Sequence, residues 1–270
     1  MANRDEELGL TRGARMWRRA HSTFAACVYF FLLMPSLIVV PMSFGDKREI
    51  MFPPANFSLT LYREYFFAST WMATTVQSLK VAVLSAAISL VVGFFAAYAL
   101  VRYDFPGKRL LNLLLLSPVL VPVIIVALGT YLYFSSLGIT GTTAAVVVAH
   151  SVHTVPFVIV TLMAGLRHVD PNLERVAELM GASRLTVLRR VTLPLLKPAI
   201  FAGTMFAFLI SFDEVVLSWF ISNTLTQTLP VKMYSSIQYE VSPVIAAIST
   251  MLTVLSLVVC LISAALQKPA

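Results

Sequence analysis

Residues 170–198 read DPNLERVAELMGASRLTVLRRVTLPLLKP and separate two apolar runs that are each long enough to cross a membrane. The stretch carries acids and arginines, whose burial in hydrocarbon is costly. Its interrupted backbone would also leave polar groups without partners in lipid. We therefore expect a structured element on one side of a membrane, of the kind that contacts a soluble partner.

The first half of this stretch has the signals of a short helix. Asp170 is a good N-cap residue and Pro171 suits the first helical position. Gly181 is expected to end the helix, because glycine adopts a left-handed backbone at little cost. The apolar residues fall at i, i+3, i+4 and i+7, which predicts one apolar face made of Leu173, Val176, Ala177 and Met180.

The second half predicts another short helix. Ser183 can cap it, and its arginines are available to acids or water. Its apolar side is expected to consist of Leu185, Leu188 and Val191. Pro194 and Pro198 are expected to end this helix and to begin the next membrane span. The alternative is a solvated connector, which would need neither two apolar faces nor this order of caps and prolines.

The composition indicates a membrane protein. The chain has 270 residues, of which 58% are hydrophobic and only 12% are charged, about half the charged share of a soluble domain. It contains no G-x-x-x-x-G-K-[ST] phosphate loop, so any ATP that drives it is bound by another chain. Cys27 and Cys260 both fall in apolar runs and lack the spacing of a metal site or a disulfide framework.

The apolar runs predict an all-α, polytopic protein with six transmembrane helices. The expected spans are approximately 22–44, 72–101, 110–134, 142–165, 198–220 and 244–266. This gives a basic N-terminal segment, 1–21, followed by one six-helix membrane domain, 22–270. The loop 166–197, between the fourth and fifth spans, contains the two short helices.

The distribution of positive charge predicts the orientation. The 20 lysines and arginines divide unevenly between the two sets of loops. Only four lie in one set, namely Lys47, Arg48, Arg63 and Lys232, and Lys80 lies at a helix end. The remaining cations lie in the termini and the other loops, including 166–197, which are therefore expected to be cytoplasmic. The basic excess is thus a topology signal and does not indicate nucleic-acid binding. The segment RGARMWRRA is expected to lie along the inner membrane surface.

Two adjacent acids, Asp213 and Glu214, lie in the fifth expected span. A carboxylate inside a membrane costs about 2.5–3.5 kcal/mol on insertion scales, so at least one acid is expected to line a polar path and attract a cation. The alternative is that one acid is paired internally or fixes a partner subunit. Trp219, Tyr234 and Tyr239 could offer ring faces to an ammonium group, or could simply pack.

His150 and His153 lie three residues apart in the fourth span. That spacing could hold a metal, but no further ligand lies near in sequence. We therefore expect no metal site and interpret these side chains as hydrogen-bonding partners across a helix interface. No Ser/His/Asp or Cys/His arrangement occurs in an aqueous setting, so catalysis by the chain itself is not expected.

The loop also carries a known family pattern. Permease subunits of bacterial ABC importers have E-A-A-x-x-x-G-x9-I-x-L-P, and Arg175 to Pro194 read R-V-A-x-x-x-G-x9-V-x-L-P with complete spacing. The chain resembles this family from about residue 70 to its end, although Arg175 replaces the family glutamate. The resemblance implies that the loop docks on an ATPase subunit through Glu174, Arg175, Val176, Ala177, Glu178, Gly181, Ala182, Leu185, Leu193 and Pro194.

The segment SFDEVVLSWF at 211–220 and the text after it resemble permeases of polyamine importers. This resemblance implies a type I ABC importer permease fold in a bacterial inner membrane and putrescine or spermidine as the solute. It also implies two ATPase subunits that bind ATP and Mg, an extracytoplasmic binding protein, and a second permease that differs from this one. The chain itself would then need no cofactor.

Other functions remain open from the sequence. One alternative is the same permease role for another amine or an aminophosphonate. A stand-alone secondary transporter or a membrane scaffold is a further alternative. A secondary transporter would show more intramembrane acids and an internal repeat.

Overall fold

The computed structural model describes residues 12–46, 51–68, 70–239 and 241–266, and these residues form helices and no strands. The chain divides into two compact units, residues 1–69 with 241–270, and residues 70–240. The first unit contains α2 (Arg12–Met42), α3 (Thr60–Arg63), the π-helix η1 (Glu64–Ala68) and α13 (Val244–Leu266). The second unit contains all the helices from α4 to α12.

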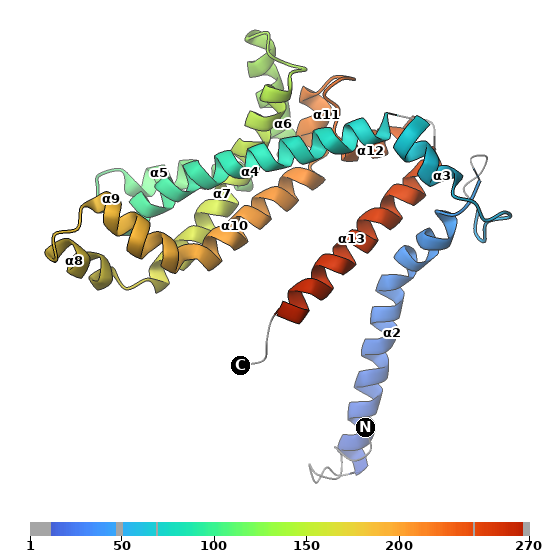
Figure 1. Ribbon diagram of the computed structural model, residues 1–270, viewed down its shortest axis with the longest axis horizontal. Helices are drawn as coiled ribbons and strands as arrows, with labels where there is room; N and C mark the ends of the chain where they lie inside the picture. Colours follow the sequence, from blue (N-terminus) through green and yellow to red (C-terminus); the bar gives the residue numbers. More distant parts are fainter. Residues whose placement is uncertain (1–11, 47–50, 69, 240, 267–270) are drawn as a thin grey trace. The chain divides into compact units, whose positions relative to one another are not determined.

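The second unit is built on three long helices, α4 (Trp71–Arg102), α7 (Thr143–His168) and α10 (Leu193–Asp213), which pack side by side (Figure 1). Shorter helices complete the unit: α5 (Lys108–Leu120), α6 (Val123–Ser136), α8 (Pro171–Leu179), α9 (Arg184–Val187), η2 (Leu188–Thr192), α11 (Val216–Ile221) and α12 (Leu229–Tyr239).

The core of the second unit is made of small and branched residues from these three helices. It consists of Ala86, Phe94, Ala97, Val158, Leu162, Leu166, Leu196 and Ala207. Buried hydroxyls add bonds between helices: Ser85 donates to the Val147 carbonyl at 3.0 Å, and the Ser89 and Thr154 hydroxyls lie 2.7 Å apart. Small residues and hydroxyl bonds are typical of helix contacts in lipid, where apolar burial alone does not drive association.

Two glycines allow this close packing. A Cβ on Gly165 would lie 2.4 Å from the Ala199 Cβ, and a Cβ on Gly93 would lie 2.8 Å from a Val158 methyl carbon. Gly165 thus lets α7 approach α10, and Gly93 lets α4 approach α7.

The described helices confirm part of the expected span set. Four helices are long and apolar enough to cross a membrane: Ala20–Met42, Trp71–Arg102, Thr143–His168 and the continuous helix Arg184–Asp213. The apolar helix Val244–Val258, in α13, is shorter than a span. Six spans therefore remain a prediction. Helix α2 begins at Arg12 and includes the basic residues that follow, and their place along the inner membrane surface stays a prediction.

The expected span 110–134 is not one continuous helix, because α5 and α6 are bent by 104°. Val121 takes an extended backbone, φ −91° and ψ 134°, as residues before proline prefer. Pro122 then begins α6 and has no N–H with which to continue α5. If α5 and α6 together count as one broken span, the described residues contain five candidate spans.

Replacing Gly165 by alanine is expected to lower stability, because the new methyl group would overlap Ala199 and force α7 away from α10. Overpacking of this kind costs about 1–3 kcal/mol. The measurement is the midpoint of thermal unfolding of the purified chain in detergent. Gly129→Ala is the matched control: its Cβ meets nothing within 4 Å, so its midpoint should be unchanged or higher. Equal midpoints for both variants would contradict the packing role of Gly165.

Candidate functional site

The loop between α7 and α10 folds as a capped helix, a glycine turn and a second helix. The Asp170 carboxylate accepts the Asn172 N–H at 2.9 Å, which caps α8, and Pro171 occupies the first turn. Gly181 has φ +87° and ends this helix as expected. The Ser183 hydroxyl then accepts the Thr186 N–H at 3.3 Å and caps α9.

The second helix does not end at Pro194, contrary to expectation. Helix α9 continues through the π-turn η2 into α10, so Arg184–Asp213 is one continuous helix. In the π-turn the Leu193 N–H donates to the Leu188 carbonyl, five residues back. This wider turn brings Pro194 into the first turn of α10, where the missing N–H of a proline is tolerated.

The apolar side chains of this loop lie on the surface. Leu173 is 48% exposed, Val176 is 53% exposed and Met180 is 84% exposed. Leu179 and Leu185 add to the exposed apolar surface, at 87% and 55%. We call these five residues the α8 surface. Apolar side chains gathered at this exposure on one short element are typical of a surface that meets another protein.

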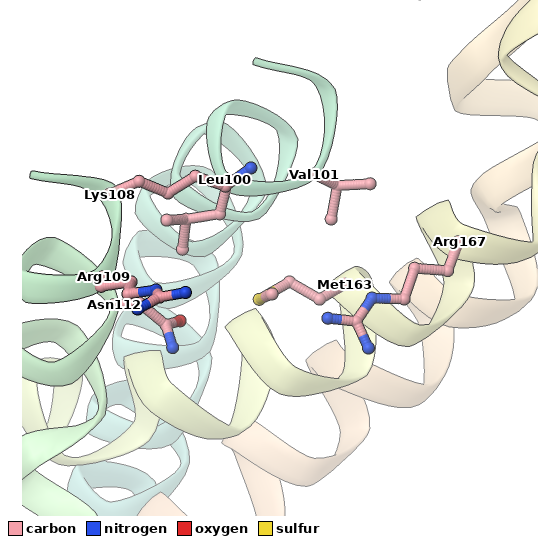
Figure 2. A pocket seen from close by; sticks show the side chains of 7 residues that line it. All are labelled: Leu100, Val101, Lys108, Arg109, Asn112, Met163 and Arg167. Carbon is pink, nitrogen blue, oxygen red and sulfur yellow. The ribbon is translucent and has the colours of Figure 1, made fainter. Parts of the chain in front are cut away.

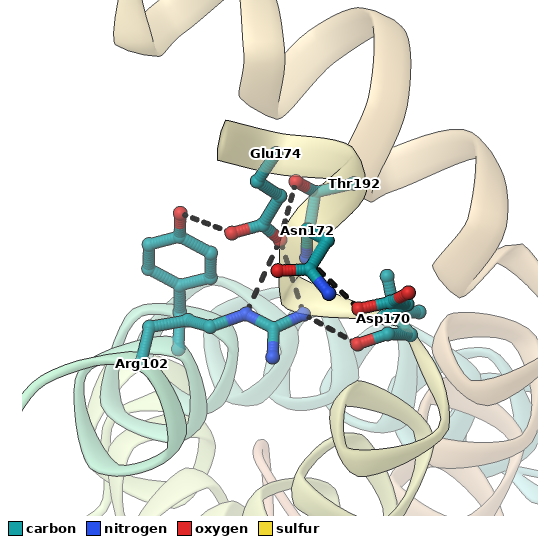
Figure 3. Close-up of polar contacts among 7 residues, drawn as sticks. Arg102, Asp170, Asn172, Glu174 and Thr192 are labelled. Carbon is teal, nitrogen blue, oxygen red and sulfur yellow. Dashed lines mark hydrogen bonds and ion pairs between the residues drawn. The ribbon is translucent and has the colours of Figure 1, made fainter. Parts of the chain in front are cut away.

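Glu174 has a different position from its neighbours. Its carboxylate accepts from Arg102 Nε at 3.2 Å and from the Thr192 hydroxyl at 3.0 Å (Figure 3). The Tyr98 hydroxyl lies 3.4 Å from its other oxygen. The side chains of Arg102 and Glu174 are only 9% and 12% exposed. Glu174 therefore ties α8 to the end of α4 and does not face outward with the α8 surface.

Arg102 also donates to the Val169 carbonyl at 3.0 Å, at the residue before the Asp170 cap. One guanidinium thus holds both the beginning of the loop and the first turn of α8. We call Arg102, Glu174 and Thr192 the loop clamp. Sequence reasoning counted Arg102 only as a topology signal. The one hint was its place in the last turn of an apolar helix.

The other residues assigned to the loop divide by exposure. Three of them are exposed, namely Arg175, Glu178 and Pro194. Three others are half-buried, namely Ala177, Ala182 and Leu193. The exposed arginine and glutamate lie beside the α8 surface in sequence and can offer charges to a partner.

The fifth expected span is also broken. Helix α10 ends at Asp213 and α11 begins at Val216, so the two acids lie at a helix end and not inside one span. The Glu214 carboxylate accepts the Leu217 N–H at 3.0 Å, which satisfies a backbone donor at the start of α11. Its other oxygen lies 3.6 Å from His153 Nε2. Asp213 is exposed, so the two neighbouring acids have different surroundings.

His150 fixes this break from α7. Its Nδ1 lies 2.8 Å from the Ser211 hydroxyl in α10, and its Nε2 lies 2.7 Å from the Ser218 hydroxyl in α11. The imidazole is 1% exposed, and both of its nitrogens are occupied, which leaves neither for a metal. His150 thus makes the hydrogen bonds across a helix interface that its sequence position predicted.

The three aromatic residues singled out in the sequence come together. Trp219, Tyr234 and Tyr239 line one cavity of about 610 Å³ with residues that include Val215, Val216 and Gln238. The Trp219 and Tyr234 rings are perpendicular, with centroids 5.3 Å apart. Asp213 and Glu214 are not part of this lining, although Val215 follows them directly.

Known proteins resemble this chain over most of its length. Residues 89–268 match the family "Binding-protein-dependent transport system inner membrane component". The spermidine/putrescine transport system permease protein PotC of Haemophilus influenzae is 32% identical over 242 residues, covering 90% of this chain and 94% of that protein. The putrescine transport system permease protein PotI of Escherichia coli is 30% identical over 231 residues, covering 83% and 82%.

A solved structure supports the same fold. A chain of a bacterial ABC transporter involved in the import of alginate superposes with a TM-score of 0.76 and 15% identity, covering 96% of this chain and 98% of that chain. The sequence match extends over well more than half of the chain, and the helical architecture agrees with it. This protein therefore belongs to the family of binding-protein-dependent transport system inner membrane components, the permease subunits of ABC importers.

Proposed function

We propose that this chain forms half of the translocation path of an ATP-driven importer for a small cationic amine such as putrescine or spermidine. The observation that carries the proposal is the α8 surface, an exposed apolar face held in place by the buried loop clamp. A surface of this kind serves a docked partner. In this family of importers the partner at this loop is the ATPase.

The complete importer would then contain two ATPase subunits, which bind the ATP and Mg, and a second, different permease. An extracytoplasmic binding protein would deliver the amine. The chain would lie in a bacterial inner membrane with both termini and α8 in the cytoplasm, which the distribution of lysine and arginine supports. Its own part is to provide the path and to change shape when the ATPases close.

The end of α10 is the favoured place for the amine. The last carbonyls of a helix carry partial negative charge and have no intrahelical donor. Asp213 adds a full negative charge at the same end and is exposed. A carboxylate and an ammonium group about 4 Å apart gain roughly 4 kcal/mol at an effective dielectric of about 20, before desolvation. The nearby cavity lined by Trp219 and Tyr234 offers ring faces to the same cation.

The polyamine assignment rests on the relatives, since PotC and PotI carry spermidine and putrescine in their names. Amines of this kind have two or more ammonium groups along an apolar chain. An acid at a helix end and an aromatic-lined cavity suit the two parts of such a molecule.

Replacing Gly181 by leucine is expected to uncouple ATP hydrolysis from transport. The backbone at Gly181 has φ +87°, which a leucine adopts only with strain, so the turn between α8 and α9 would change. Uptake of labelled putrescine and substrate-stimulated ATP hydrolysis are measured in vesicles that contain the whole importer. We expect uptake to fall at least about tenfold while some hydrolysis persists.

Gly138→Leu is the matched control, because Gly138 also has a positive φ, +67°, and a Cβ at either position meets nothing within 4 Å. It lies in the turn between α6 and α7, away from α8 in sequence. The same strain there should leave the ratio of uptake to hydrolysis unchanged. Normal coupling in Gly181→Leu would remove the coupling role of this turn.

Replacing Asp213 by asparagine is expected to reduce uptake of both putrescine and spermidine at least about tenfold at normal protein levels. The change removes a charge but keeps the size of the side chain. Glu214→Leu is the companion variant: Glu214 accepts the Leu217 N–H and lies beside the His153 ring, and leucine can make neither contact, so the change should lower the amount of folded protein more than the uptake per molecule. Uptake that is unaffected by Asp213→Asn would leave the acid with a structural role only.

Absence of amine uptake by the wild-type importer would separate the substrate from the permease role. The transported solute would then be another small polar compound. The α8 surface and the ATPase partner would be unaffected by that result.

Replacing Glu174 by glutamine is expected to impair coupling, because it leaves the Arg102 guanidinium mostly buried without its anion. Uptake should fall at least about tenfold. The double variant Arg102→Gln/Glu174→Gln should recover part of it, since no uncompensated charge remains. Asp104→Asn breaks only the exposed pair with Lys108 and should leave uptake unchanged. A double variant as impaired as the separate losses in Arg102→Gln and Glu174→Gln combined would argue against a direct Arg102–Glu174 interaction.

A further inference from the structure

A basic cavity lies where three helices meet at the α8 end of the second unit. It has a volume of about 530 Å³ and is lined from α4, α5 and α7 by Leu100, Val101, Lys108, Arg109, Asn112, Met163 and Arg167 (Figure 2). It is separate from the loop clamp and from the aromatic cavity. Neither the family pattern nor the proposed transport cycle uses it.

The cations of this cavity are not equivalent. Lys108 donates to Asp104 at 2.9 Å and to the Tyr103 carbonyl at 3.0 Å. The hydrogen bond from Lys108, and then its charge, hold the pKa of Asp104 below its usual value, so that pair is neutral overall. Among the described residues, Arg109 and Arg167 have no acidic partner within ion-pair distance. The two guanidinium groups therefore leave a net positive charge in the cavity.

The cavity also contains an unpaired polar atom. Asn112 lies three residues after Arg109, on the same face of α5, and Figure 2 shows the two side chains together. The Asn112 side-chain oxygen is buried and has no hydrogen-bond partner in the described part of the chain. Buried acceptors normally have a donor. The site thus offers two cations to an anion and one acceptor to a hydroxyl.

The surroundings indicate a lipid as the ligand. Helix α5 begins at Lys108, with no side-chain cap on its first N–H groups, and first-turn N–H groups favour anions. Just beyond these cations, Leu110, Leu113 and Leu114 are 60% or more exposed, along a helix of a membrane protein. A phosphate group at the cations would place an acyl chain beside these leucines. Basic pockets between membrane helices bind lipid headgroups in this way.

We propose that this cavity binds the headgroup of an anionic phospholipid that carries hydroxyls, of the phosphatidylglycerol class. Arg109 and Arg167 hold the phosphodiester, because the planar fork of N–H donors on a guanidinium group suits phosphate oxygens. Asn112 accepts a bond from a headgroup hydroxyl. The site does not depend on which solute the importer carries.

The test is native mass spectrometry of the purified full chain in nonionic detergent, with phosphatidylglycerol, phosphatidylcholine or inorganic phosphate added in increasing amounts. We expect phosphatidylglycerol to bind at least about tenfold more tightly than phosphatidylcholine. Each arginine near a membrane surface contributes about a fivefold change in affinity for anionic lipid. Arg109→Gln/Arg167→Gln should therefore weaken phosphatidylglycerol binding about 25-fold.

Arg189→Gln/Arg190→Gln is the matched control, because it removes the same charge from two exposed residues of η2 that do not line the cavity. It should keep the wild-type affinity for phosphatidylglycerol. Arg109→Lys/Arg167→Lys keeps the charge and should retain most of the binding, which covers the case in which the glutamine variant does not fold. Equal lipid binding by the glutamine variant and the wild type would overturn the proposal.

Two further outcomes would also overturn it. Arginine-dependent binding of inorganic phosphate, without preference for phosphatidylglycerol, would identify a site for free anions. Loss of the bound lipid when the whole importer is assembled would assign the cavity to a protein interface.

The role of Asn112 has its own readout. Phosphatidylmethanol has the same phosphodiester but no headgroup hydroxyl. The wild type should bind phosphatidylglycerol more tightly than phosphatidylmethanol, and Asn112→Leu should bind the two equally. An unchanged preference in Asn112→Leu would remove Asn112 from the site.

Discussion

The mostly buried ion pair between Arg102 and Glu174 is the interaction on which the loop and its surface depend. It joins the last residue of α4 to the first turn of α8, and the same guanidinium holds the Val169 carbonyl where the loop begins. Two charges removed from water are stable only when their remaining bonding positions are filled. Tyr98 and Thr192 supply those bonds. This network ties α8 to α4 and η2, while the apolar side chains of α8 remain outside.

The same requirement for filled bonding positions explains where the long helices break. A helix end inside a membrane protein needs side chains to replace the missing backbone partners. At the α10–α11 break these side chains are Glu214, which accepts a backbone N–H, and His150, which holds a serine on each side. At Pro122 the proline begins α6 without an N–H to satisfy. The two breaks are therefore supported differently, by polar side chains between α10 and α11 and by a proline between α5 and α6.

Local signals in the sequence predicted the loop well, and long-range contacts limited the rest. Asp170, Ser183 and Gly181 act within a few residues of themselves, so their caps and turn could be read directly. Glu174 was expected to face a partner. Its bond to Arg102 could not be predicted from local signals, because it joins residues 72 positions apart. Pro194 was expected to end a helix, but a π-turn before it accommodates the ring. The aromatic cavity was foreseen only as separate residues, since three helices and a turn bring it together.

Helix α10 connects the two halves of the proposed mechanism. Its first turn follows η2 directly, and Thr192, the last residue of η2, belongs to the loop clamp. Its last residue is Asp213, which lies about 30 Å away along a helix of 21 residues. Helix α10 packs against α4 and α7 over this distance, and we expect it to transmit a tilt at one end to the other end. His150 bonds to a serine on each side of the break after Asp213, so the beginning of α11 is tied to the end of α10. Under the proposed mechanism, we expect a displacement of α8 by a partner to reach the acid through α10.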